Sequence, residues 1–341
     1  MARFRPPPFH NRRIQLTNNF SLLAYTLAST LCLSACGGGD SAVSSDAGSS
    51  SNVPTNSPTQ SVPGTVATPQ YAGASAQLAM FIAINQYRTQ CGFPALRENT
   101  ILDQAAQAHA KYEGLNNVIT DTEVQGRPGF TGVTGADTAA TLGWPAGVFT
   151  GRGDAGFYDG ALVTPAQFGR QFVSAWASGV YHVSIMTYPA NLVGFGEYET
   201  TYNGFPAGAG TVQFGQTATY TLANAPQTFP CQGVMGIAYR GAGETPTPPN
   251  TSGAWGTPVA VMGNLSDTVM LTSAIYTAPG EAPISLQILN STADPNHLLG
   301  QYQAVAYPTT PLQPNTQYSV VLNGTINGTA FSRTFTFTTG S

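Results

Sequence analysis

The chain has 341 residues, of which only 8% are charged, and its formal net charge is −4. Typical soluble domains carry roughly 25% charged residues, so this surface must be rich in uncharged polar side chains. Only 8 of the 12 basic residues but all 16 acidic residues follow Cys36, which leaves a net charge of about −8 beyond that position. Nucleic acid is therefore not expected as a partner, because binding to phosphates needs a basic patch.

Residues 1–36 have the pattern of a secretory leader. Four arginines precede a mostly apolar run, residues 20–31, that is too short for a comfortable membrane span. The run leads into Leu33-Ser34-Ala35-Cys36, which has the pattern of a bacterial lipobox, in which the cysteine is lipidated and becomes the new N-terminus. The alternative is an ordinary leader with an incidental cysteine, but the Gly-Gly-Gly-Asp that follows favours the lipobox. We expect an exported protein anchored in a membrane of the cell envelope through a lipid at Cys36, on the periplasmic face or the cell surface, or released from it.

Residues 37–74 consist mostly of Gly, Ser, Thr, Pro, Ala and Val, and we expect them to form a flexible tether. Beyond the leader only Cys91 and Cys231 remain. An even pair of cysteines in an exported protein predicts a disulfide, whereas no further cysteine supports a metal site. The disulfide would close a loop of about 140 residues, which contributes roughly 4–5 kcal/mol in the chain-entropy model.

Apolar residues at helical spacing begin near residue 75. They predict a first helix that ends before Gly92, and a second that is capped by Asn99. The second helix places His109 on its apolar face, so we expect a buried histidine with satisfied hydrogen bonds. A third helix should start at Thr164-Pro165, a cap followed by a proline in the first helical position, and should end near Gly179.

Short strand patterns follow, at residues 192–199, 211–222 and 233–239. Helices first and strands later predict one α+β domain over residues 75–243. Residues 244–252 hold three prolines and should form an extended linker. Residues 253–341 have six short strand patterns with Asn-Gly turns between them, which predicts a small β-sandwich.

Few residues offer chemistry. The chain lacks the motifs of zinc proteases, nucleophile elbows, phosphate loops and dinucleotide sites. Three histidines remain beyond the leader: His109, His182 and His297. We expect His297 to lie exposed in a turn.

Residues from about 76 to 240 resemble the CAP superfamily, also called the SCP domain (cysteine-rich secretory proteins, antigen 5 and pathogenesis-related 1). The resemblance is carried by Asn85-Gln-Tyr-Arg88, Gly92-Phe-Pro-Ala-Leu96, the stretch from Leu102 to Ala110, Gly143-Trp144, the stretch from Trp176 to His182, and Val193-Gly-Phe-Gly196. It implies a three-layer α-β-α sandwich. The C-terminal strands resemble bacterial immunoglobulin-like modules, through residues 312–318 and 335–339, so the expected fold is a CAP sandwich followed by a small β-sandwich.

The resemblance also implies a central cleft, in which many members hold two histidines and two acidic residues and bind a divalent metal. Carried over by position, the second cleft histidine falls on His182, and the acidic residue four before it falls on Ser178. The first cleft histidine falls on Asp121, and the glutamate expected near residues 150–152 is missing. The remaining carboxylates near the cleft positions are Glu123 and Asp154.

His182, Asp121 and Glu123 are therefore the residues expected to bind a ligand. His182 and Asp121 would hold at most a weakly bound divalent ion, zinc or calcium, because zinc sites usually have three or four protein ligands. A catalytic Ser178–His182 pair would also need an orienting acid and an oxyanion hole.

We accordingly expect a non-catalytic binding protein of the cell envelope, whose partner is a lipid, a glycan or an envelope protein. One alternative is a metal-assisted or serine-type hydrolase of peptide or cell-wall material, with His182, Ser178 and Asp121 at its centre. The other is a structural or adhesive surface module that makes its contacts through the β-sandwich.

Overall fold

The computed structural model describes residues 15–17, 62–159, 162–202 and 204–341. The predicted lipidation site Cys36, most of the predicted leader and the first part of the predicted tether lie outside the described residues. Among the described residues, no helix combines the length and apolar character that a membrane span requires.

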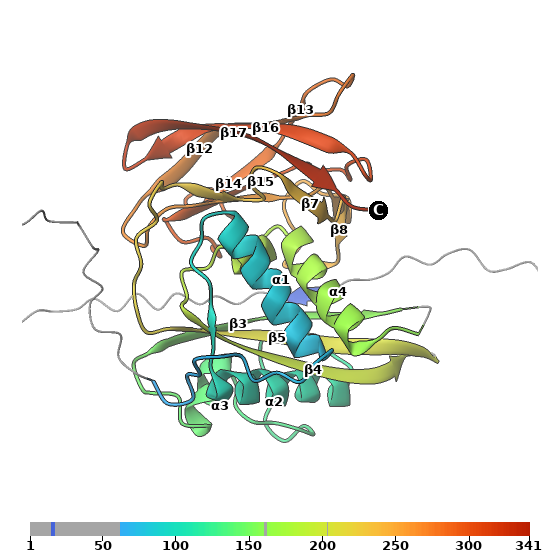
Figure 1. Cartoon of the computed structure of the whole chain (residues 1–341). Helices are drawn as coiled ribbons and strands as arrows, with labels where there is room; N and C mark the ends of the chain where they lie inside the picture. The colour runs from blue at the N-terminus through green and yellow to red at the C-terminus, as the bar shows by residue number, and fades with distance from the viewer. Residues whose placement is uncertain (1–14, 18–61, 160–161, 203) are drawn as a thin grey trace, which may run out of the picture.

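The N-terminal half is built on a six-stranded sheet with helices on both faces (Figure 1). In order, its strands are β2 (Arg97–Glu98), β4 (Leu192–Tyr202), β5 (Phe205–Gln216), β3 (Phe149–Tyr158), β1 (Gln15–Thr17) and β9 (Glu244–Thr245). Helices α2 (Thr100–Asn116) and α3 (Gly135–Thr141) cover one face, and α1 (Ala76–Gln90) and α4 (Pro165–Ser178) cover the other. This arrangement confirms the predicted α+β class and its three α-β-α layers. Strand β1 falls within the predicted leader, so processing at Cys36 would remove it from the sheet.

Side-chain caps place the helices where the sequence predicts them. Ser75 accepts a hydrogen bond from the backbone N–H of Leu78 at the start of α1, and Asn99 accepts two at the start of α2. Thr164 and Gln167 form a capping box at the start of α4, with Pro165 in the first turn. Helix α4 ends at Gly179, and a short 3-10 helix, η1 (His182–Met186), follows.

The C-terminal half consists of two main sheets that are stacked in Figure 1. One sheet has the order β14 (Gln287–Asn290), β15 (Gln303–Tyr307), β11 (Val259–Met262) and β6 (Gln227–Phe229). The other has the order β13 (Ile284–Ser285), β12 (Val269–Thr277), β16 (Gln317–Ile326), β17 (Thr329–Thr339) and β7 (Val234–Ile237). Strands β8 (Gly241–Ala242) and β10 (Ala254–Trp255) form a further pair. The strand-rich C-terminal region is thus as expected, and its immunoglobulin-like character stays a prediction.

The two halves are more interleaved than the predicted boundaries suggest. Strands β6 and β7 lie before residue 243, yet they pair with β11 and β17 of the C-terminal half. The proline-rich segment is not simply a spacer, because its first residue, Glu244, is buried and forms part of β9 in the N-terminal sheet. Residues 227–245 therefore cross between the two halves.

The predicted tether ends earlier than expected, because residues 62–74 pack on the folded domain. The Asn99 amide donates to the carbonyl of Pro63 and the hydroxyl of Thr65. The Tyr71 hydroxyl donates to Asp103 at 2.7 Å, and its ring contacts Phe81. Composition alone misses this, because the contacts are made to side chains on later helices.

One apolar core runs through both halves. It joins Phe172 and Trp176 of α4 to Val261 of β11 and Phe337 of β17. The predicted disulfide between Cys91 and Cys231 is confirmed, with the two Cα atoms 5.4 Å apart. It links the C-terminal end of α1 to the turn between β6 and β7, so a covalent bond reinforces the packing between the halves.

Candidate functional site

His182 lies where α4 gives way to η1, at the boundary between the two halves. Trp176 and Phe172 on the buried face of α4 anchor this corner, and Gly179 ends the helix. The His182 side chain is 0% exposed. It is therefore part of the interior of the described structure and not a surface group.

The carboxylate of Glu244 holds this corner in place. It accepts hydrogen bonds from the backbone N–H groups of Val180, Tyr181 and His182, at 2.7 to 3.0 Å. Its Oε1 atom also lies 2.7 Å from Nδ1 of His182. Three consecutive N–H groups around one carboxylate form an anion cradle, in which the chain's own side chain supplies the anion.

Further bonds tie the same corner to the C-terminal half. The indole N–H of Trp255 donates to the carbonyl of Ser178 at 2.8 Å. The hydroxyl of Tyr181 donates to Asp294 at 2.9 Å and accepts from the amide of Asn296 at 2.7 Å. His182 therefore belongs to a buried joint between the halves.

Ser178 is not arranged as a nucleophile. Its hydroxyl donates to the carbonyl of Ala175 at 2.9 Å, one turn earlier in α4. The side chain is nearly fully buried beneath Trp255, so substrate has no access to it in this arrangement. The Ser178 hydroxyl is thus used as a donor within its own helix, whereas activation by a base requires it to donate to that base.

The predicted ion site at His182 and Asp121 stays a prediction, and the described contacts of the two residues are to other groups. Nδ1 of His182 faces Glu244, and the backbone carbonyl of Asp121 accepts a hydrogen bond from the guanidinium of Arg152. Within the ranges that the structure describes, one group of at least three His, Cys, Asp or Glu side chains has the spacing for a metal ion, and it includes neither residue.

That group is His109, Glu113 and Asp154, beneath α2. As expected, His109 is buried and both of its ring nitrogens have partners. Nδ1 lies 2.9 Å from Oε1 of Glu123, and Nε2 lies 2.8 Å from the carbonyl oxygen of Thr120. Because both partners are acceptors, both ring nitrogens are placed to donate, which is the arrangement of a protonated imidazole.

Two further carboxyl groups face the same ring. Nε2 of His109 lies 3.7 Å from Oε1 of Glu113 and 3.6 Å from Oδ2 of Asp154. Both acidic side chains are 0% exposed. Burial, reinforced by the charge of Asp154, raises the pKa of Glu113 well above its ordinary value.

Glu123, which is predicted as a ligand-binding residue, contacts Nδ1 of His109. It also accepts from the backbone N–H and the hydroxyl of Thr131, at 2.6 and 3.1 Å. Burial raises the pKa of Glu123, but the hydrogen bonds from His109 and Thr131 outweigh that effect and hold it below its ordinary value. The side chain thus fixes the loop that follows α2.

Two more acidic side chains near α2 have raised pKa values. Burial, with smaller contributions from Glu98, raises the pKa of Asp103 to about 7, although Tyr71 and the N–H of Phe195 donate hydrogen bonds to it. On β4, burial and the neighbouring Glu199 raise the pKa of Glu197 to about 7. These groups lie away from the predicted cleft residues in sequence, and no motif marks them.

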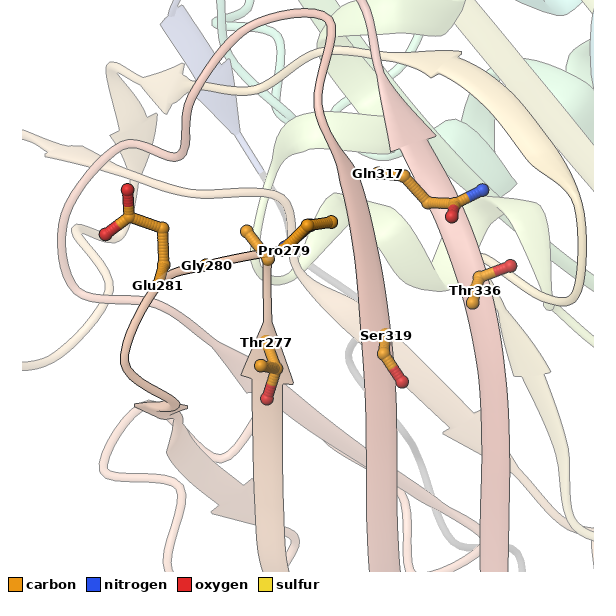
Figure 2. A pocket seen from close by; sticks show the side chains of 8 residues that line it. Thr277, Pro279, Gly280, Glu281, Gln317, Ser319 and Thr336 are labelled. Carbon is orange, nitrogen blue, oxygen red and sulfur yellow. The ribbon is translucent and has the colours of Figure 1, made fainter.

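The C-terminal half carries an open groove of about 320 Å³ on its outer sheet (Figure 2). Thr277, Ser319 and Thr336 line its floor from three neighbouring strands, and the turn with Glu281 forms one side. The lining offers hydroxyls, one amide and one carboxylate, but no histidine. It suits hydrogen bonding to a polar ligand better than acid–base chemistry.

Glu113 and Glu244 were not predicted from the sequence, and only Glu113 has a recognisable sequence signal. Glu113 stands four residues after His109, so the two share a helix face, and this spacing was available. Glu244 left no signal, because its partners lie more than 60 residues away. His297 is exposed in a turn, as expected.

A family model for CAP, the cysteine-rich secretory protein family, matches residues 81–205. No curated protein matches the chain. The matched residues run from within α1 to the end of β4, and so include most of α1, the other three α-helices and strands β2, β3 and β4 of the sheet. The match supports the CAP superfamily for this α-β-α part of the chain, which is followed by a strand-rich C-terminal region.

Proposed function

We propose that the protein is a non-catalytic binding protein of the cell envelope, anchored through a lipid at Cys36. The observation that carries this proposal is that the candidate catalytic residues form hydrogen bonds within the protein. His182 and Ser178 are buried in the joint between the halves, where their polar groups serve Glu244 and the end of α4. A site of this kind stabilises the fold and leaves the outer surface to make contacts.

The groove on the C-terminal half is the surface best suited to those contacts. It is open, its lining offers hydroxyls, one amide and the carboxylate of Glu281, and it lies on the sheet that faces away from α1 and α4 (Figure 1). Such a lining can hydrogen-bond a glycan or an extended peptide. The adhesive alternative uses the same surface, so both proposals place recognition in this half.

The test uses the exported chain with Cys36→Ser, which removes the predicted lipid anchor. We expect this chain to co-sediment saturably with isolated cell-wall material or envelope membranes. Ser319→Arg, which places a bulky side chain on the groove floor, should weaken the association. Thr329→Arg adds the same charge at the exposed start of β17, outside the groove, and should not weaken the association.

Absence of saturable binding to every envelope fraction would contradict the binding proposal. Equal binding by both arginine variants would move recognition away from the groove. Hydrolysis of peptide or cell-wall substrates that is lost in His182→Gln, with the fold retained, would instead favour the enzymatic alternative.

A further inference from the structure

We propose that His109, Glu113 and Asp154 form a binding site for a divalent transition-metal ion, for which zinc is the best-suited ion. The three side chains come from two elements, with His109 and Glu113 one turn apart on α2 and Asp154 on β3. One ligand atom from each lies within 4.8 Å of the other two. This set is different from the one that the family resemblance predicts, and it does not depend on the proposed envelope binding.

The spacing of the three side chains is somewhat wider than that of tetrahedral coordination. Nε2 of His109 is 3.7 Å from the nearest oxygen of Glu113 and 3.6 Å from that of Asp154. Zinc binds nitrogen and oxygen at about 2.0–2.2 Å, which puts tetrahedral neighbours roughly 3.3–3.5 Å apart. Small side-chain movements are therefore enough to bring all three atoms onto one ion. The carbonyl oxygen of Thr120, which lies 2.8 Å from Nε2 as a hydrogen-bond partner, would have to move away from this nitrogen for an ion to bind.

Two carboxylate oxygens at this place lack hydrogen bonds. Oε2 of Glu113 and Oδ2 of Asp154 are buried and have no hydrogen-bond partner in the described part of the chain. Buried polar atoms without partners are uncommon, because desolvation costs about 1–3 kcal/mol or more for each. Coordination to an ion would give Oδ2 of Asp154 a partner and would compensate the buried charge of Glu113, whose Oε1 is the oxygen nearer to His109.

Neighbouring groups hold the three ligands in orientation. Oδ1 of Asp154 accepts from the hydroxyl of Thr211 at 2.7 Å, and Oε1 of Glu113 accepts from the N–H of Thr120 at 2.9 Å. Glu123 contacts Nδ1 of His109, which leaves Nε2 to face the acidic pair. A carboxylate behind a ligand histidine is the usual outer arrangement of protein metal sites.

The cationic neighbour Arg152 forms an ion pair with Asp154 at the edge of the site, and its buried Nε and Nη1 atoms have no hydrogen-bond partner among the described residues. Its Nε atom is 3.8 Å from Oδ2 of Asp154, which is too long for a hydrogen bond, and its guanidinium donates to the carbonyl of Asp121. Binding of an ion does require the Nε2 proton of His109 to leave, as it does for any ligand histidine. The ion would then take the place of this proton between His109 and the carboxylates of Glu113 and Asp154.

The site has the closed character of a structural metal centre. Its three side chains are 0% exposed, so the ion would not meet substrate. Thr120 and Glu123 belong to the segment between α2 and α3, and the ion would fix that segment against α2 and β3. The expected consequence is a more stable domain and slower cleavage of this segment by protease.

The test is zinc and cobalt binding to the exported chain with Cys36→Ser after treatment with a chelator. We expect one ion per chain, a dissociation constant of about 1 μM or below, and cobalt absorption bands of the intensity typical of tetrahedral sites. Zinc should also raise the melting temperature. Glu113→Gln and Asp154→Asn keep the size and hydrogen-bonding capacity of the side chains while removing an anionic ligand, so these variants should fold.

Both variants should weaken zinc binding by about 100-fold or more, and Glu123→Gln, behind the histidine, by about 10- to 100-fold. His297→Ala, at an exposed histidine, should bind like the parent chain. Binding weaker than about 100 μM in the parent chain would overturn the proposal. Tight binding that persists in Glu113→Gln and Asp154→Asn would overturn it as well, since the ion would then lie elsewhere.

Discussion

Glu244 shows how one side chain can connect two halves of a molecule. Its carboxylate is buried and accepts from three backbone N–H groups in addition to facing His182. Removal of the Glu244 carboxylate leaves several buried donors without an acceptor, and such a loss typically lowers the free energy of unfolding by about 3–5 kcal/mol. The segment that contains Glu244 was predicted as a linker, and its side chain explains why it does not behave as one.

Glu244→Ala should therefore lower the free energy of unfolding by about 3–5 kcal/mol. Glu281→Ala removes an exposed carboxylate from the C-terminal half and is the matched control, with an expected change within about 0.5 kcal/mol. Urea unfolding followed by circular dichroism measures both. Equal stability of the two variants would show that water replaces the carboxylate at little cost.

Asp103 gives the fold a dependence on pH. Its pKa of about 7 lies above the ordinary value of 3.8, so the folded state binds this proton more tightly than the unfolded chain does. The stabilisation is complete below about pH 4 and is lost as the pH rises through about 7. Burial is the main cause of the raised pKa and Glu98 adds to it, whereas the hydrogen bond from Tyr71 lowers the pKa in part.

Asp103→Asn retains an oxygen acceptor for Tyr71 and Phe195 but cannot ionise. We expect this variant to lose less stability than the parent chain between pH 4.5 and pH 7.5, because one proton-linked group is removed. Urea unfolding at several pH values provides the measurement, with Glu281→Gln as the control. A pH profile that is identical in the parent chain and Asp103→Asn would rule out this role.

Strand β4 and helix α2 lie unusually close together, and glycine permits it. A Cβ atom at Gly194 would lie 2.1 Å from the backbone of α2, and one at Gly196 would lie 2.2 Å from it. These are the two glycines of the Val193-Gly-Phe-Gly196 motif that supports the family resemblance. The close approach matters for the site, since α2 carries His109 and Glu113.

Gly196→Ala should destabilise the protein by about 1–3 kcal/mol, because the methyl group would force β4 and α2 apart. Gly73→Ala is the matched control, since no atom lies within 4 Å of its would-be Cβ and its backbone needs no positive φ. Thermal unfolding separates the two. If both variants melt together, the close packing is not a constraint on stability.

The positions of helices and strands were more predictable from the sequence than the way in which these elements pair and pack. The caps at Asn99 and Thr164 are local signals, and both helices begin where these residues predict. Strands β6 and β7 were harder to place, because a strand pattern does not say which sheet it joins. The same limit applies to the site, where the His109–Glu113 spacing is local, whereas Asp154 and Glu244 arrive from distant segments.

At the scale of the whole molecule, the apolar core is continuous between the halves. Helices α1 and α4 pack on the sheet with one face and meet the C-terminal strands with another (Figure 1). The disulfide joins the same two regions, from the end of α1 to the segment between β6 and β7. We therefore expect the halves to unfold together in one transition.

Replacing both cysteines by alanine tests how far the disulfide contributes to this coupling. Cys91 and Cys231 are 140 residues apart, and a loop of that length is worth about 4–5 kcal/mol in the chain-entropy model. Cys91→Ala/Cys231→Ala should lose that much free energy of unfolding. Parent protein reduced with dithiothreitol is the control and should show the same loss, because both remove the same loop constraint.

Calorimetry and near-ultraviolet circular dichroism should still give one coincident transition in the double variant, since the shared core and Glu244 remain. Two separated transitions would mean that the disulfide, and not the core, makes the halves cooperate. A loss below about 1 kcal/mol would mean that the unfolded chain is already compact enough for the bond to constrain little. A single transition in the double variant would mean that the two halves unfold together because of the buried contacts of α1 and α4 with the C-terminal strands.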